Sequence, residues 1–124
     1  MNNLKTTIWG RELDLDVVFD VFDGGTIKED QNKAFDLFIE NIKNLDNCLS
    51  NVKEYCIENS NEKLTAVDNI FKYVMPKTIY IFNSFDGNRI VALLCNFKFD
   101  MEHGMAIVFK NEEISEIGDQ SLII

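Results

Sequence analysis

Apolar and charged residues alternate strictly between positions 12 and 21, and this pattern constrains the fold more than any other in the chain. A period of two places the apolar residues on one face of a β-strand: Leu13, Leu15, Val17, Phe19 and Val21. The opposite face, interrupted by Val18, then carries the carboxylates of Glu12, Asp14, Asp16 and Asp20. We therefore expect a strand with one buried face and one strongly anionic face.

A shorter β-prone run at residues 6–9 precedes this strand and ends at Gly10, so the two segments are expected to form a hairpin. The sequence Asp23-Gly24-Gly25 should end the second strand. Residues 26–29, with threonine first and glutamate last, have the form of a helix N-terminal capping box. A long helix is expected to follow.

Helical periodicity continues through the middle of the chain. Apolar residues recur at steps of three and four between residues 35 and 56: Phe35, Phe38, Ile42, Leu45, Leu49, Val52 and Cys56. After a polar break at residues 58–61, a second and shorter helix is expected from a similar set: Leu64, Val67, Ile70, Phe71 and Val74. Either Ser60 or Asn61 could cap this helix, which Pro76 would prevent from continuing.

The remainder of the chain alternates between strand and turn signals. Strands are expected at residues 78–83, 90–99, 105–110 and 113–117, joined as an antiparallel meander. Residues 90–95 are apolar on both faces, which predicts a strand at the centre of the sheet or beneath a helix. The whole pattern predicts an α+β fold over residues 1–124 as a single domain. Its antiparallel sheet has about six strands in ββααββββ order, with two helices on one face.

The charge balance restricts the possible partners. The chain has 21 acidic and 12 basic residues, a formal net charge of −9, which disfavours direct binding to nucleic acid and favours a basic protein partner. The first residues lack the apolar segment of a signal peptide, and no apolar run is long enough for a membrane span, so a cytoplasmic protein is expected. Cys48, Cys56 and Cys95 lie in apolar stretches, as buried free thiols would. A monomer or weak dimer is expected.

The most prominent polar turn contains Asp100, Glu102, His103 and Gly104. Its carboxylates and imidazole are metal ligand types, and His103 could act as a general base oriented by a neighbouring carboxylate. However, side chains diverge in such a turn, and the candidate nucleophiles Ser84 and Ser121 are ordinary turn residues. The favoured reading is a structural turn in which Gly104 adopts an unusual backbone dihedral. No catalytic, cofactor-binding or metal-binding residue is therefore assigned, and the protein is expected not to be an enzyme.

The anionic strand face is the best candidate for a partner-binding surface. Its residues are Glu12, Asp14, Asp16 and Asp20, with Asp23 and Asp86 near the same end. Closely spaced carboxylates steer a basic partner towards the surface, although a solvated sheet face would carry the same pattern. Trp9 could be an interaction anchor on this surface or a core residue.

The end of the chain carries a recognisable motif, Asp100-Met101-Glu102-His103-Gly104-Met105-Ala106, followed by Ile117-Gly118-Asp119-Gln120. These residues, together with Phe109, resemble the closing segment of an uncharacterised family of small bacterial domains, and Trp9-Gly10 matches more loosely. Such domains look like immunity proteins of polymorphic toxin loci, including contact-dependent growth inhibition systems. The resemblance implies a non-enzymatic protein that covers the basic surface of a cognate toxin such as a nuclease. The alternatives are a small-ligand or metal-binding accessory domain that uses residues 100–104, and a weak hydrolase.

Overall fold

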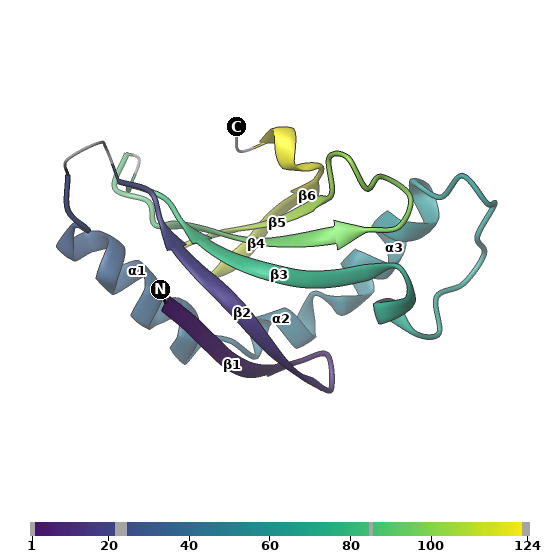
Figure 1. Cartoon of the computed structure of the whole chain (residues 1–124), viewed down its shortest axis with the longest axis horizontal. Helices are drawn as coiled ribbons and strands as arrows, with labels where there is room; N and C mark the ends of the chain where they lie inside the picture. Colours follow the sequence, from purple (N-terminus) through teal and green to yellow (C-terminus); the bar gives the residue numbers. More distant parts are fainter. Residues whose placement is uncertain (1, 22–24, 85, 123–124) are drawn as a thin grey trace.

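Six strands form one sheet in the computed structural model, which describes residues 2–21, 25–84 and 86–122 (Figure 1). The strands are β1 (Asn2–Ile8), β2 (Arg11–Phe19), β3 (Val74–Ile81), β4 (Ile90–Phe97), β5 (Met105–Lys110) and β6 (Glu113–Gly118). They lie side by side in chain order, and neighbours are antiparallel except for the parallel pair β2 and β3. The predicted α+β fold and element order are confirmed. The parallel pair was not predicted, because it joins segments separated by all the helices.

The first two strands form the expected hairpin. Ile8 pairs with Arg11, so the connecting turn contains two residues, Trp9 and Gly10. Both have positive φ values, 52° and 82°, as a type I′ turn requires. Leu15 and Val17 are buried beneath the helices, as the alternation predicted.

The predicted single helix across residues 35–56 is wrong. Three helices occupy this region: α1 (Glu29–Glu40), α2 (Asn44–Asn47) and α3 (Leu49–Glu58). The interruption follows α1 at Asn41, whose side-chain Nδ2 donates to the Leu37 carbonyl oxygen. Side chains of this kind compete with the backbone for hydrogen bonds, and residues 41–47 contain three asparagines and one aspartate. Together the helices still cover one face of the sheet (Figure 1).

The predicted capping box at residues 26–29 is also wrong, because α1 begins three residues later than Thr26. Gln31, rather than Glu29, reaches back to the helix start, and its Oε1 accepts a hydrogen bond from the Lys28 backbone N–H at 2.9 Å. Its Nε2 donates to the Asp20 carbonyl oxygen at 2.7 Å. Gln31 is almost fully buried, and it ties the start of α1 to the end of β2.

The predicted second helix over residues 64–74 is replaced by irregular chain and a short 3-10 helix, η1 (Ile70–Lys72). The apolar residues of that segment contact the core without forming a helix. Asn69 Oδ1 accepts from the Phe71 N–H at the start of η1, and strand β3 then begins at Val74. Pro76 therefore lies inside β3, next to a bulge between residues 76 and 78. A bulge tolerates a proline because the strand ladder is interrupted there.

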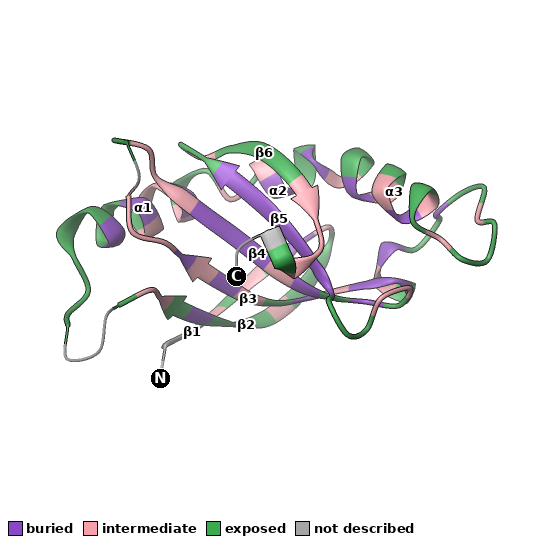
Figure 2. Ribbon diagram, turned by 90° about the horizontal axis from the view of Figure 1, so that it is seen from above, coloured by how far each residue is buried: buried purple, intermediate pink, exposed green. Residues whose placement is uncertain are grey.

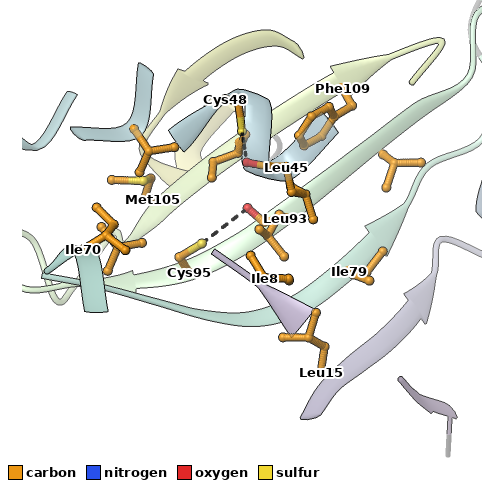
Figure 3. Close-up of a cluster of buried hydrophobic side chains, with 14 of the residues drawn as sticks. Ile8, Leu15, Leu45, Cys48, Ile70, Ile79, Leu93, Cys95, Met105 and Phe109 are labelled. Carbon is orange, nitrogen blue, oxygen red and sulfur yellow. Dashed lines mark hydrogen bonds between the residues drawn. The ribbon is translucent and has the colours of Figure 1, made fainter. Parts of the chain in front are cut away.

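The main core lies between the sheet and the helices (Figure 3). Ile8, Leu15, Ile79 and Leu93 point from the sheet towards Leu45 and Cys48 of the helical layer, and all are almost fully buried (Figure 3). Burying each aliphatic side chain of this size contributes roughly 1.5 to 3 kcal/mol. Strand β4 lies in the middle of the sheet and is buried along most of its length, as predicted for residues 90–95 (Figure 2).

Candidate functional site

The sheet face opposite the helices, here called the outer face, carries the acidic side chains predicted to bind a partner. Two rows of residues cross this face in register. The first row contains Asp16, Thr78, Leu94, Ala106 and Gly118, and the second contains Val18, Tyr80, Ala92, Val108 and Glu116. The face is therefore polar at β2 and apolar towards β4 and β5.

Glu12, Asp14 and Asp16 form an exposed line on β2, here called the acidic row. Alternate residues of a strand lie about 7 Å apart, so three negative charges fall within roughly 14 Å. Lys5 of β1 lies directly opposite Asp14 in the strand register. The prediction of an exposed anionic stretch is confirmed for these three residues.

Asp20 differs from the acidic row because it is half-buried and has hydrogen-bonding neighbours. Asn83 Nδ2 donates to Asp20 Oδ2 at 3.4 Å. Burial raises the pKa of the Tyr80 hydroxyl, and the charge and hydrogen bond of Asp20 raise it further. Asp20 therefore fixes Tyr80 on the outer face rather than presenting a free charge. Asp23 lies outside the described residues, and Asp86 is exposed in the turn before β4.

An apolar patch lies beside the acidic row on the outer face. Ala92 and Ala106 are fully buried, Val108 is nearly so, and half-buried Phe82, Ile90 and Leu94 pack around them. Tyr80 packs against Phe82 with ring centroids 4.8 Å apart, and Val18 is 41% exposed. The outer face is therefore apolar rather than charged over β4 and β5. The signal was present, because residues 90–95 are apolar at every position.

The C-terminal segment lies over this same face. It includes η2 (Gln120–Leu122), which contacts β5 and lies on the side of the sheet away from the helices (Figures 1 and 2). The Gln120 backbone N–H donates to the His103 carbonyl oxygen at 3.0 Å. Its side-chain Nε2 donates to the Cys95 carbonyl oxygen at 3.3 Å. The segment thus borders the apolar patch and is held by the turn that contains the histidine.

The turn at residues 100–104 closes on its own backbone, as predicted. Asp100 Oδ1 accepts from the His103 backbone N–H at 3.0 Å, and the Asp100 carbonyl oxygen accepts from the Gly104 N–H at 2.8 Å. Gly104 has φ +64°, and a Cβ added there would lie 2.6 Å from Gln120 Nε2 and 2.7 Å from the Cys95 carbonyl oxygen. The two halves of the terminal motif, around Gly104 and Gln120, therefore meet in space. Only glycine fits at their junction.

His103 is exposed and lies beside Asp100, with its Nδ1 3.1 Å from Asp100 Oδ1. The hydrogen bond and charge of Asp100 raise the pKa of the imidazole above its ordinary value. Glu102 is exposed next to it. Throughout the described ranges, no group of three or more histidine, cysteine, aspartate or glutamate side chains converges in a way that could hold a metal ion.

The three cysteines are buried free thiols. Burial raises the pKa of Cys48 and of Cys56 to about 11, and it raises the pKa of Cys95 further. A thiol must lose its proton to act as a nucleophile, so burial and the raised pKa both disfavour reaction of these side chains in the folded protein. Ser121 is engaged by Asp119, whose Oδ1 accepts from both its backbone N–H and its hydroxyl.

Trp9 serves as an internal anchor in this fold. Its indole N–H donates to the Leu45 carbonyl oxygen at 2.7 Å, and its ring lies 6.0 Å from that of Phe71. The guanidinium group of Arg11 lies over the Phe71 ring, with its Cζ 4.3 Å from the ring centroid. Trp9 is only partly buried, so one side of the indole stays near the surface of the hairpin turn. Of the two sequence readings, contact with the core accounts for its main interactions.

Comparison with known proteins identifies a family for almost the entire chain. A family model described as "Domain of unknown function (DUF6985)" matches residues 2–124. The chain belongs to this family. No curated protein and no solved structure gives a significant match. Among the described helices, none is long and apolar enough to cross a membrane.

Proposed function

We propose that the protein is a non-enzymatic binding protein of the cytoplasm that neutralises a basic toxin domain, in the manner of an immunity protein. The observation that carries this proposal is the exposed acidic row on β2 beside the apolar patch on the same face. The resemblance of the terminal motif to immunity proteins supports the same reading. A toxin that acts on nucleic acid would offer the required basic surface.

The two parts of the outer face would make different contributions to binding. Solvent-exposed carboxylates accelerate encounter with a basic partner and set its orientation, but each adds little affinity. Affinity comes mainly from aromatic and apolar groups that lose contact with water, as Tyr80 and Phe82 would. An acidic rim next to an apolar centre matches the usual anatomy of a protein interface.

The direct test uses the product of the gene immediately upstream, which the proposal predicts to be a basic toxin domain. In the test variant, the acidic row is neutralised by Glu12→Gln, Asp14→Asn and Asp16→Asn. The control variant has the same change in net charge but alters exposed carboxylates of α1, on the helical side of the molecule and away from the sheet edge, by Asp30→Asn, Asp36→Asn and Glu40→Gln.

We expect the test variant to bind the toxin at least about tenfold more weakly than the control in low-salt buffer. The difference should shrink at about 0.5 M salt, because salt screens exposed charges. Growth protection in cells that express the toxin should follow the same order. Equal binding by the two variants would remove the acidic row from the interface, and no binding by the native chain at low salt would contradict the proposed function.

A further inference from the structure

Two neighbouring hollows, which share Ile114 in their linings, follow the free edge of the sheet between β6 and the helices α2 and α3, and together they are here called the edge groove. Strand β6 is the last strand of the sheet and pairs with β5 on one side. Helix α3 packs against β6, and both helices lie beside this edge (Figure 2). We propose that this edge groove binds a short, extended and basic segment of another protein, which adds to β6 as a further strand.

The backbone of β6 supplies the first part of such a site. An edge strand presents N–H and C=O groups that have no partner strand, and an extended peptide can pair with them in a manner independent of its sequence. The residues of β6 are exposed over Glu113–Glu116 and half-buried at Ile117 and Gly118. Backbone pairing therefore requires no rearrangement of a covering segment among the residues that the structure describes.

The floor of the groove is apolar. Ile114 and Ile117 pair in register with Phe109 and Ile107, whose side chains belong to the core on the helical side. Both isoleucines therefore face the helices, and Ile114 is 38% exposed. Tyr55 of α3 completes this floor and is half-buried. Apolar side chains on alternate positions of an added strand would cover these groups.

The rim of the groove is acidic. Glu54 and Glu58 of α3 line one side, and Glu116 borders the strand edge from the outer face of β6, with all three exposed. Among the described residues that line this groove, no lysine or arginine offsets their charge. Charge complementarity thus selects an occupant that carries lysine or arginine.

The strand is held firmly at its start. Arg89 makes a paired interaction with Glu112, in which Nε and Nη2 each lie 2.8 Å from a carboxylate oxygen. Asn44 of α2 donates to the Glu112 carbonyl oxygen at 2.8 Å. The turn before β6 is therefore fixed to α2 and to Arg89, the residue that precedes β4, and a pre-formed edge loses less conformational entropy on binding.

A second copy of this chain fits the groove poorly. Pairing between two β6 strands would bring together the glutamates of both copies, which repel each other. In addition, Ser115 forms a bulge, since Ile114 and Glu116 pair with the adjacent residues Phe109 and Val108. A bulge interrupts the regular edge for any added strand, so it favours a short segment over the long contact between two sheets. The opposite edge, β1, carries Lys5 in place of an acidic rim.

This inference does not depend on the partner being a toxin, and it is tested with a defined probe. The probe is a peptide of about eight residues with alternating lysine and valine, which suits the usual length of a strand. Binding to the isotope-labelled full chain is followed by NMR at low salt. We expect amide shifts confined to β6 and α3, and slower hydrogen exchange of β6 amides.

Two comparisons identify the binding mode. The variant with Glu54→Gln, Glu58→Gln and Glu116→Gln should bind the probe about tenfold more weakly, whereas neutralising the acidic row on β2 should change its affinity by less than about twofold. A probe N-methylated at alternate residues should lose binding, because it cannot donate to the strand edge. Absence of saturable binding, shifts centred on β1 or β2, or equal affinity of the N-methylated probe would overturn the proposal. None of these outcomes alters the toxin-binding test, which depends on the acidic row.

Discussion

The indole Nε1 of Trp9 donates a hydrogen bond of 2.7 Å to the carbonyl oxygen of Leu45. This bond joins the β1 and β2 hairpin to the short helix α2, where Leu45 is fully buried. Trp9 also has φ 52°, a backbone conformation that costs a bulky residue of order 1 kcal/mol or more. The hydrogen bond and the packing of the ring offset that cost, so the turn geometry and the tertiary contact depend on each other.

Replacing Trp9 by phenylalanine should destabilise the fold. Phe retains a ring in contact with Phe71 but leaves the Leu45 carbonyl without its indole donor. We expect a loss of about 1 to 2 kcal/mol in the free energy of unfolding, measured by urea denaturation. Asp46→Ala removes only an exposed acceptor of the Trp9 backbone N–H and should cost less than half as much. A Trp9→Phe variant as stable as the native chain would show that the indole bond contributes nothing.

Gly104 should be far less tolerant of alanine than Gly87. Both have positive φ values, +64° and +76°, so both substitutions strain the backbone by about 1 kcal/mol. A Cβ at residue 104 would also collide with the Cys95 carbonyl oxygen and Gln120, whereas a Cβ at residue 87 meets nothing within 4 Å. We expect Gly104→Ala to lower stability by about 3 kcal/mol in total. Equal costs for the two variants in thermal unfolding would contradict the proposed contact.

The three thiols should react only after unfolding. All are buried, and the pKa of Cys48 and Cys56 is about 11, so little thiolate exists at pH 8. Labelling with a thiol reagent should therefore follow the rate of global opening and accelerate sharply in urea. Ser50→Cys, at an exposed helical position, provides a positive control that should label at once. Rapid labelling of the native chain in buffer would show that the core opens locally.

Stability should fall as His103 loses its proton. Because Asp100 raises the pKa of the imidazole in the folded state, the charged form is favoured there relative to the unfolded chain. This contribution is complete below the ordinary pKa of 6.5 and is lost as the pH rises through the higher folded value. An NMR titration of the native chain should show the raised pKa, and Asp100→Asn should return it towards 6.5. An unchanged pKa in that variant would exclude Asp100 as the cause.

Much of the strand arrangement was predictable because its signals are local. Alternation from Leu13 to Phe19 identified β2 and its buried face, and the turn residues between residues 86 and 112 divided the later strands. The exposed acidic row followed from the same alternation. The apolar patch was missed because a fully apolar strand does not reveal what covers each of its faces.

The helical region was harder to predict for physical reasons. Leu64, Val67 and Ile70 have helical spacing, yet they belong to a segment that reaches the core without regular structure. The spacing of apolar residues cannot distinguish a helix from an irregular segment when tertiary contacts decide the conformation. The break after Asn41 and the role of Gln31 depend on individual side-chain hydrogen bonds. The parallel contact of β2 with β3 has no local signature.

That parallel contact affects how the chain folds. Strands β3 to β6 follow one another through short connections, whereas Asp16 reaches Thr78 only after the intervening helices have been placed. Closing such a long loop carries a large entropic penalty, so we expect the meander to nucleate first and the hairpin to dock late. Truncating Val17 should then accelerate unfolding with little effect on the folding rate. The acidic row on β2 would therefore be among the last parts of the molecule to reach its native position.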